Sequence, residues 1–230
     1  MKIGGLQKTS LLDYPDTISA IVWTVGCNFC CPFCYNKKLV TGDVELIAED
    51  EVLGFLDKRK GVLEGVVITG GEPFLQKDLE GFLIKVKKMG YLVKVDTNGT
   101  FPEELKKLLE EKLVDYVAMD VKAPKNKYSK LSGVKTRIGD IEKSIEIIKE
   151  HAPSYEFRTT FVPGLLKKED IVKIAEWLNG AKCFYLQQFQ NNPPLVSSDM
   201  KQQAPYPRQY IYETLDAIKS YFKSCEVRGV

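Results

Sequence analysis

The sequence is poor in histidine. His151 is the one histidine in 230 residues, which makes histidine-dependent triads and histidine-rich zinc catalysis poor explanations of its function. It stands at the end of a helical pattern, directly before Ala152 and Pro153, where a solvated helix end is the simplest expectation.

Long apolar runs are also missing. The longest, such as residues 18–25, are strand-sized and too short to span a bilayer. The N-terminus lacks the apolar stretch of a signal peptide. We therefore expect a cytoplasmic protein with no membrane partner. The cytoplasm keeps thiols reduced, which favours metal binding over disulfides.

Neither sign of charge is in excess. There are 33 basic and 31 acidic residues, and the net charge is +2, so the chain as a whole does not have the charge of a nucleic-acid or membrane-surface binder. A length of 230 residues with 44% hydrophobic residues suffices for one core, and we expect a single domain over residues 1–230.

Cysteine, by contrast, is concentrated in one place. Four of the six cysteines fall within eight residues, at Cys27, Cys30, Cys31 and Cys34. Disulfides between cysteines so close in sequence would close small, strained rings and would constrain no long loop. Thiolates at this spacing are typical of a metal centre.

Two kinds of metal centre compete. Structural zinc usually joins two cysteine pairs from separate segments, but here the pairs overlap, and Cys183 and Cys225 stand alone. An iron–sulfur cluster accepts close cysteines on one loop. Three cysteines would leave one iron open for a ligand, as catalytic zinc keeps an open position. The cluster is favoured, and a zinc-binding, non-catalytic module remains an alternative.

The hydrophobic pattern predicts alternating strands and helices. Strands are expected at residues 17–24, 65–69, 92–96, 115–120, 155–161, 183–187 and 225–228. Helices are expected at 47–59, 78–89, 102–111, 140–150, 168–178 and 209–222, and a polar, proline-rich loop at 190–207. About six βα units predict an α/β fold with parallel strands. Because a full barrel needs eight, an incomplete TIM-type barrel fits, as does an open sheet.

Polar residues and glycines lie at or just after the carboxyl ends of these predicted strands, and one arginine lies within a strand. Because the carboxyl ends of parallel strands share one face, where ligands bind, we expect them to form one site. Each has a simpler explanation when taken alone: a tight turn for the glycines, solvated side chains for the acidic and lysine residues, and a structural ion pair for the arginine. The residues are Gly70, Gly71, Glu72, Asp96, Thr97, Asn98, Asp120, Lys122, Arg158, Gln187 and Gln188.

These motifs resemble a known superfamily. The spacing Cys27-x3-Cys31-x2-Cys34, with Phe33 before the last cysteine, resembles the radical SAM signature, and residues 70–73 resemble its GGE motif. Segments 5–15, 26–36, 96–99 and 119–122 are similar to glycyl-radical-enzyme activases, most of all to anaerobic ribonucleoside-triphosphate reductase activating proteins. Two residues depart from the pattern of these activases. Cys30 stands at a position that is often basic in relatives, and Tyr35 stands where a histidine is common.

The resemblance implies an oxidoreductase with two cofactors. Cys27, Cys31 and Cys34 would hold a [4Fe–4S] cluster, and S-adenosylmethionine would chelate its open iron. One electron from a low-potential donor such as ferredoxin or flavodoxin would cleave the sulfonium S–C5′ bond. The resulting 5′-deoxyadenosyl radical would take hydrogen from a glycine of a partner, anaerobic ribonucleotide reductase. The alternative is a small-molecule enzyme similar to deazapurine synthases.

The same resemblance implies roles for individual residues. Lys122 would be catalytic, and a monovalent cation would bind near the acidic residues. Strand alternation, rather than the resemblance, turns Arg158 into the mouth of the barrel; there it would pair with a carboxylate, and we expect it to be catalytic as well. The charge pattern itself, apart from the resemblance, suggests that lysines at 122, 125, 127 and 130 help to dock a partner, although a solvated loop is the simpler explanation. The cofactor-binding residues would be Phe33, Gly70, Gly71, Glu72, Asp96, Thr97, Asn98, Asp120 and Lys122.

Overall fold

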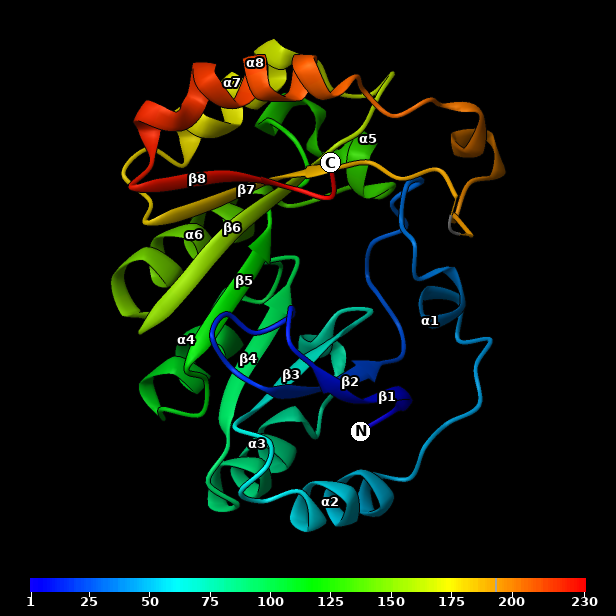
Figure 1. Ribbon diagram of the computed structural model, residues 1–230, viewed down its shortest axis with the longest axis vertical. Coiled ribbons are helices and arrows are strands. Elements are labelled where there is room, and N and C mark those ends of the chain that lie inside the picture. The colour runs from blue at the N-terminus through cyan, green and yellow to red at the C-terminus, as the bar shows by residue number, and fades with distance from the viewer. Residues whose placement is uncertain (193) are drawn as a thin grey trace.

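The structure, a computed structural model, describes residues 1–192 and 194–230; residue 193, within the predicted 190–207 loop, lies outside the described residues. The described residues form an eight-stranded sheet whose strands follow in sequence order (Figure 1). These strands are β1 (Ile3–Ser10), β2 (Ser19–Thr24), β3 (Gly65–Gly70), β4 (Leu92–Thr97), β5 (Tyr116–Asp120), β6 (Ser154–Phe161), β7 (Cys183–Gln188) and β8 (Ser224–Arg228).

Helices connect the strands. The α-helices are α1 (Lys37–Thr41), α2 (Glu49–Lys58), α3 (Leu79–Lys88), α4 (Pro102–Glu110), α5 (Tyr128–Ser132), α6 (Ile138–His151), α7 (Lys168–Trp177) and α8 (Arg208–Ile218). Short 3₁₀ helices cover Pro73–Leu75, Lys125–Lys127, Ser198–Gln202 and Lys219–Tyr221. No helix of the described residues is long and apolar enough to cross a membrane.

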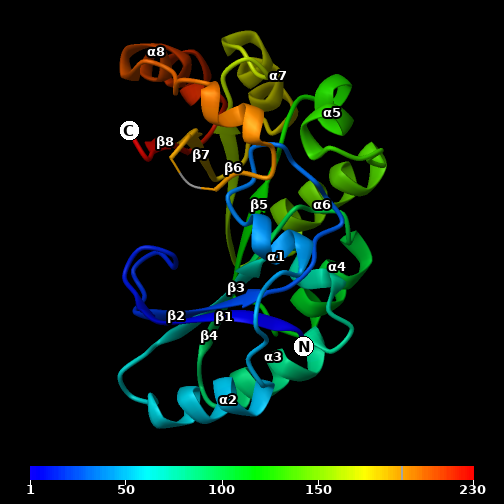
Figure 2. The same ribbon diagram turned by 90° about the vertical axis from the view of Figure 1, so that its right-hand side faces the viewer.

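The sheet curves into an open barrel. Strands β2 to β8 are parallel, and β1 pairs antiparallel with β2. Within the described residues no ladder joins β8 to β1, so the barrel does not close. Helices α3 to α6 lie on one side of the sheet, whereas the β1–β2 loop and the C-terminus lie on the other (Figure 2). The predicted α/β fold with an incomplete barrel of about six βα units, here β2–α2 to β7–α8, is confirmed.

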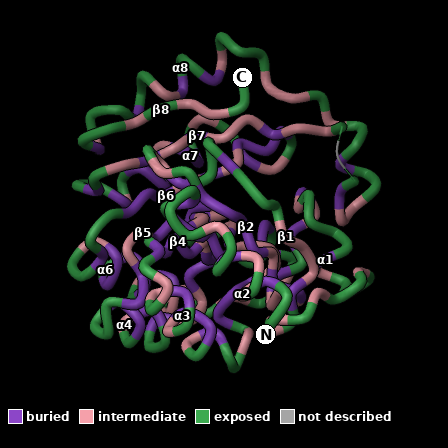
Figure 3. The backbone as a smooth tube through the Cα atoms, turned by 60° about the horizontal axis from the view of Figure 1, so that its bottom comes forward, coloured by how far each residue is buried: buried purple, intermediate pink, exposed green. Residues whose placement is uncertain are grey.

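Strand alternation separates the helix-covered core from the barrel interior. On β4, Val93 and Val95 are fully buried in the core shared with the helices, whereas Lys94 and Asp96 take part in ion pairs inside the barrel. This follows from the two-residue period of a strand. Buried backbone is concentrated in the strands and in the helix faces turned toward them (Figure 3).

Strand β1 was not predicted. Its sequence, IGGLQKTS, contains two glycines and a polar half, a pattern that does not favour a strand. Tertiary packing explains the glycines. A Cβ on Gly4 would lie 2.7 Å from the side chains of Leu39 and Val25, and one on Gly5 would lie 3.1 Å from Trp23. The short helices α1 and α5 were missed because five residues carry too little periodicity to detect.

Candidate active site

The cysteine loop leaves β2 and is fixed by backbone hydrogen bonds from distant segments. Gly26 donates its N–H to the Leu39 carbonyl at 2.8 Å, and Cys30 donates to the Ser132 carbonyl at 2.8 Å. On the other side, the amides of Val196 and Ser197 donate to the carbonyls of Cys34 and Pro32, at 3.1 and 3.0 Å. The loop is therefore held from several elements at once, although its own sequence is irregular.

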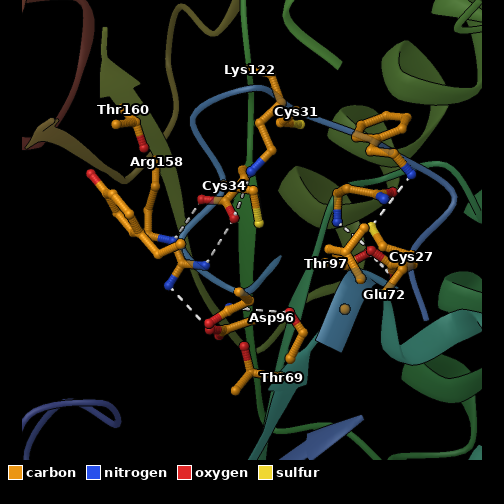
Figure 4. Close-up of a pocket in the computed structure, with 18 of the residues that line it drawn as sticks. Cys27, Cys31, Cys34, Thr69, Glu72, Asp96, Thr97, Lys122, Arg158 and Thr160 are labelled. Carbon is orange, nitrogen blue, oxygen red and sulfur yellow. Dashed lines mark hydrogen bonds and ion pairs between the residues drawn. The ribbon is translucent and has the colours of Figure 1, made fainter. Parts of the chain in front are cut away.

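The structure separates the four cysteines into three and one. Cys27, Cys31 and Cys34 line one pocket (Figure 4), whereas Cys30 is exposed and lies outside it. Burial raises the pKa of the Cys27 thiol to about 11 and that of Cys31 to about 12. Metal binding at these thiols would therefore displace protons at neutral pH.

The glycine pair after β3 serves the packing of the cysteine loop. Gly71 donates its N–H to the Thr24 carbonyl at 2.9 Å, and Glu72 donates to the Gly26 carbonyl at 2.9 Å. A Cβ on Gly71 would lie 1.8 Å from the Gly26 carbonyl oxygen, and one on Gly70 would lie 2.5 Å from the backbone of Thr24. The resemblance predicts that Gly70 and Gly71 bind a cofactor, and in the structure their backbone packs closely against the chain itself.

The Glu72 carboxylate is fully buried and accepts three hydrogen bonds. Thr97 donates its hydroxyl to Oε1 at 2.8 Å, and the backbone amides of Asn98 and Phe74 donate to Oε2 and Oε1, at 2.7 and 3.3 Å. The side chain therefore ties the turn after β3 to the turn after β4. Burial raises the pKa of Glu72 to about 7, against the opposing effect of these donors.

We expect this carboxylate to make stability depend on pH. Between its ordinary pKa of 4.5 and the folded value of about 7, the folded state keeps a proton that the unfolded state has released. That contribution is complete below pH 4.5 and is lost as the pH rises through 7. It amounts to on the order of 3 kcal/mol. Glu72→Gln, which cannot titrate, should remove this slope in denaturant unfolding of the cluster-free protein. The same slope in both proteins would contradict the assignment.

Arg158 joins the acidic residues at the ends of β4 and β5. Its Nε and Nη2 donate to Oδ1 and Oδ2 of Asp120, at 3.1 and 3.3 Å, and its Nη1 donates to Oδ2 of Asp96 at 3.3 Å (Figure 4). Burial opposes the charge of Asp120, but Arg158 and Lys122 outweigh it and lower the pKa of Asp120 to about 2. The guanidinium is thus engaged by the protein's own carboxylates, and a substrate carboxylate would have to displace one of them.

A second set of charges lies deeper in the barrel. Glu156 is fully buried and accepts two hydrogen bonds of 3.0 Å from Arg228. Its Oε1 also lies 3.6 Å from Nη1 of Arg158 and 3.8 Å from Nζ of Lys94. Each buried charge in this set is paired with a group of opposite charge, as burial requires. Glu156 thereby gives the Arg158 guanidinium a further ion pair.

The pocket gathers the predicted site residues at the carboxyl ends of the strands. Its volume is about 380 Å³, a size typical of small-molecule sites. Gln187 also lines it, whereas Gln188 does not. The predicted cofactor-binding, catalytic and metal-binding residues that line it are Cys27, Cys31, Phe33, Cys34, Gly70, Gly71, Glu72, Asp96, Thr97, Asn98, Asp120, Lys122 and Arg158.

Sequence reasoning missed several polar residues of the pocket, among them Thr160, Thr69 and Asp13. Thr160 lies two residues after Arg158 on the same face of β6, and Thr69 directly precedes the glycine pair, so strand alternation could have found both. Asp13 comes from the β1–β2 loop. No periodic pattern in the sequence marks that loop. Its place at the pocket depends on the pairing of β1 with β2, which the sequence did not predict.

The family assignment rests on a sequence comparison. A profile of the radical SAM superfamily matches residues 21–178, which is more than half of the chain. The chain belongs to the radical SAM superfamily. Members of this superfamily are enzymes that use a [4Fe–4S] cluster and S-adenosylmethionine. The matched range begins in β2 and ends after α7, and so contains the cysteine loop and the turn at Gly70.

One relative matches this chain over almost its whole length. A protein of Methanocaldococcus jannaschii, provisionally named glycyl-radical enzyme activating enzyme MJ1227, is 33% identical over 234 aligned residues. The match covers 99% of this chain and 96% of the relative. The likeness therefore includes β1 and the 190–207 region, which lie outside the superfamily profile.

Solved structures share the fold at low sequence identity. Streptococcus suis SuiB bound to S-adenosylmethionine has a TM-score of 0.70 at 15% identity, over 91% of this chain and 49% of SuiB. The chain therefore spans about half the length of SuiB. A domain of a pyruvate-formate lyase-activating enzyme from Bacteroides vulgatus has a TM-score of 0.54 at 19% identity, over 72% of this chain and 99% of that domain.

The thiols of the pocket fit an iron–sulfur cluster. Cys27, Cys31 and Cys34 come from one loop and line the same pocket. A cluster distributes its cysteine ligands over separate irons. Asp96 also lines the pocket; its Oδ1 makes no hydrogen bond in the described part of the protein and lies 3.5 Å from Nζ of Lys94.

Proposed function

We propose that this protein is a glycyl-radical-enzyme activating enzyme whose substrate is a glycine residue of a partner protein, an anaerobic ribonucleotide reductase. The observation that carries the proposal is that three thiols, the turn at Gly71 and the acidic residues around Arg158 all line one pocket. The similarity to MJ1227 over almost the entire chain supports the choice among radical SAM activities.

In this proposal the chain's residues position two cofactors. Cys27, Cys31 and Cys34 hold a [4Fe–4S] cluster, which, together with S-adenosylmethionine, supplies the 5′-deoxyadenosyl radical chemistry. The backbone at Gly71 would contact the methionyl amine, and Asp96 would accept a hydrogen bond from the cofactor or bind a monovalent cation.

Other residues shape the pocket around the cofactors. Phe33 would contact the adenine, and Lys122 lines the pocket together with the thiols. Burial disfavours the charge of Lys122, but Asp120 and the thiols of Cys31 and Cys34 raise its pKa above the ordinary value. Lys122 therefore stays cationic and stabilises negative charge at the thiol ligands.

The open barrel suits a protein substrate. The missing ladder between β8 and β1 leaves the barrel open, and Figure 2 shows the β1–β2 loop and the C-terminus on the side of the sheet away from α3 to α6. A loop of a partner can approach the pocket from that side. We also propose that residues 1–230 form one radical SAM domain and act in the cytoplasm, where reduced thiols persist.

The test is anaerobic. We expect reconstituted, reduced protein with S-adenosylmethionine and a ribonucleotide reductase of the glycyl-radical type to give a glycyl radical signal in electron paramagnetic resonance. Cleavage of the cofactor without any protein radical across plausible partners would refute the proposal. Mass spectrometry of products from metabolite pools would then identify a small-molecule substrate.

A further inference from the structure

One segment of the chain is strongly basic although the chain is almost neutral. Residues 125–137 contain five cationic side chains and no acidic one. The segment covers a 3₁₀ turn, helix α5 and the loop into α6. Nothing in the pocket chemistry uses these charges, which are Lys125, Lys127, Lys130, Lys135 and Arg137.

This segment packs directly on the cysteine loop. Cys30 donates its N–H to the Ser132 carbonyl at 2.8 Å. Gly133 has a φ of +72°, and a Cβ there would lie 2.1 Å from the Cys30 carbonyl oxygen, so only glycine permits this approach. Cys30 is followed by Cys31, a predicted cluster ligand. One hydrogen bond and a short covalent path therefore connect the basic segment to the thiol of Cys31.

Within the part of the chain that the structure describes, the unpaired positive charge lies in the middle of the segment, next to this contact. Lys125 pairs with Glu142, Lys127 with Asp170 at 2.6 Å, and Arg137 with Asp140 at 3.4 Å. In contrast, Lys130 and Lys135 are exposed, and neither has an ion pair among the described residues. These two lysines flank the Ser132–Gly133 contact on both sides.

The location suits a second protein partner. In Figure 2, α5 lies on the helix-covered side of the sheet, away from the β1–β2 loop and the C-terminus. A partner bound at α5 would leave the open side of the barrel free for a substrate loop. Exposed Cys30 and the two lysines thus form a face, here called the Cys30 face, that is separate from the substrate route.

We propose that the Cys30 face, formed by Cys30, Lys130 and Lys135, docks a small acidic, low-potential electron-transfer protein. The inference rests on the proposed function, which consumes one electron for each S-adenosylmethionine cleaved. The donor loses that electron, and it is used when the sulfonium S–C5′ bond breaks to give methionine and the 5′-deoxyadenosyl radical. Exposed lysines steer an acidic partner and favour a transient, salt-sensitive complex.

The test is a double charge reversal, Lys130→Glu with Lys135→Glu. Titration calorimetry of the iron-loaded enzyme with an oxidised acidic ferredoxin at low salt should show affinity weakened about tenfold or more. The salt dependence of the remaining binding should also be smaller. S-Adenosylmethionine cleavage driven by reduced ferredoxin should slow to a similar extent, while cleavage driven by dithionite should stay unchanged.

The matched control reverses two exposed lysines at the opposite, amino-terminal end of the strands, Lys88→Glu with Lys223→Glu. This pair should leave ferredoxin binding unchanged. Equal binding by wild type and the Lys130/Lys135 variant would overturn the proposal. Loss of dithionite-driven cleavage in that variant would also overturn it, because the lysines would then serve the pocket. Failure of the proposed function is distinct: no glycyl radical would form with either reductant.

Discussion

Single replacement of Cys27, Cys31 or Cys34 by alanine should reduce cluster content and S-adenosylmethionine cleavage to background. The three thiols line one pocket and come from a loop that backbone hydrogen bonds hold in place. Because no other cysteine lines that pocket, the described residues offer no thiol to replace a lost ligand. Iron and sulfide analysis of anaerobically purified protein measures the content, and 5′-deoxyadenosine formation measures the cleavage.

Cys30→Ala is the matched control for these variants. Cys30 is exposed and lies outside the pocket, so its removal should leave iron content and dithionite-driven cleavage at the wild-type level. Loss of the cluster in Cys30→Ala, or its retention after loss of Cys31, would show that the ligand set is wrong.

Gly71→Ala should destabilise the protein by about 2–4 kcal/mol, the combined cost of overpacking and a lost hydrogen bond. A Cβ at this position would lie 1.8 Å from the Gly26 carbonyl oxygen. Backbone must move to relieve the overlap, and the first contact affected is the 2.9 Å hydrogen bond from the Glu72 amide to that same oxygen. Because Gly26 directly precedes Cys27, cluster content should fall as well. Denaturant unfolding and iron analysis measure the two effects.

Gly81→Ala provides the comparison. Gly81 lies within α3, and a Cβ there would meet nothing within 4 Å. Alanine in a helix interior should stabilise by up to about 1 kcal/mol and leave iron content unchanged. If both variants behaved alike, the close packing of the turn on the cysteine loop would not be the reason for glycine at position 71.

The barrel was predictable because its strands carry their own signal. Buried parallel strands such as β3 are continuous apolar runs, and glycines or prolines mark most of their ends. Strand β1 carried no such signal, because its partner β2 and the packing of Trp23 make it a strand. Asp13 lies in the loop between β1 and β2, so its place in the pocket could not be predicted without predicting β1.

The sequence predicted which residues line the candidate site better than it predicted what each of them contacts. The predicted strand ends indicated which residues lie close together, because the carboxyl ends of parallel strands are on one face of the sheet. Contacts between side chains were beyond the sequence. Glu72, predicted to bind a cofactor, accepts hydrogen bonds from the chain at Thr97 and Asn98. Arg158, expected to face a substrate carboxylate, pairs with Asp96 and Asp120. Both roles toward a cofactor or substrate remain predictions.

The most direct test of the account is isotopic labelling of the partner's glycine. Reduced enzyme, S-adenosylmethionine and a partner ribonucleotide reductase should give a protein radical whose resonance is a doublet, split by the remaining Cα hydrogen. With glycine deuterated at Cα, the doublet should collapse to a single line, and one deuterium should appear in 5′-deoxyadenosine. A radical whose signal ignores the label, or unlabelled 5′-deoxyadenosine formed at the full rate, would contradict the account.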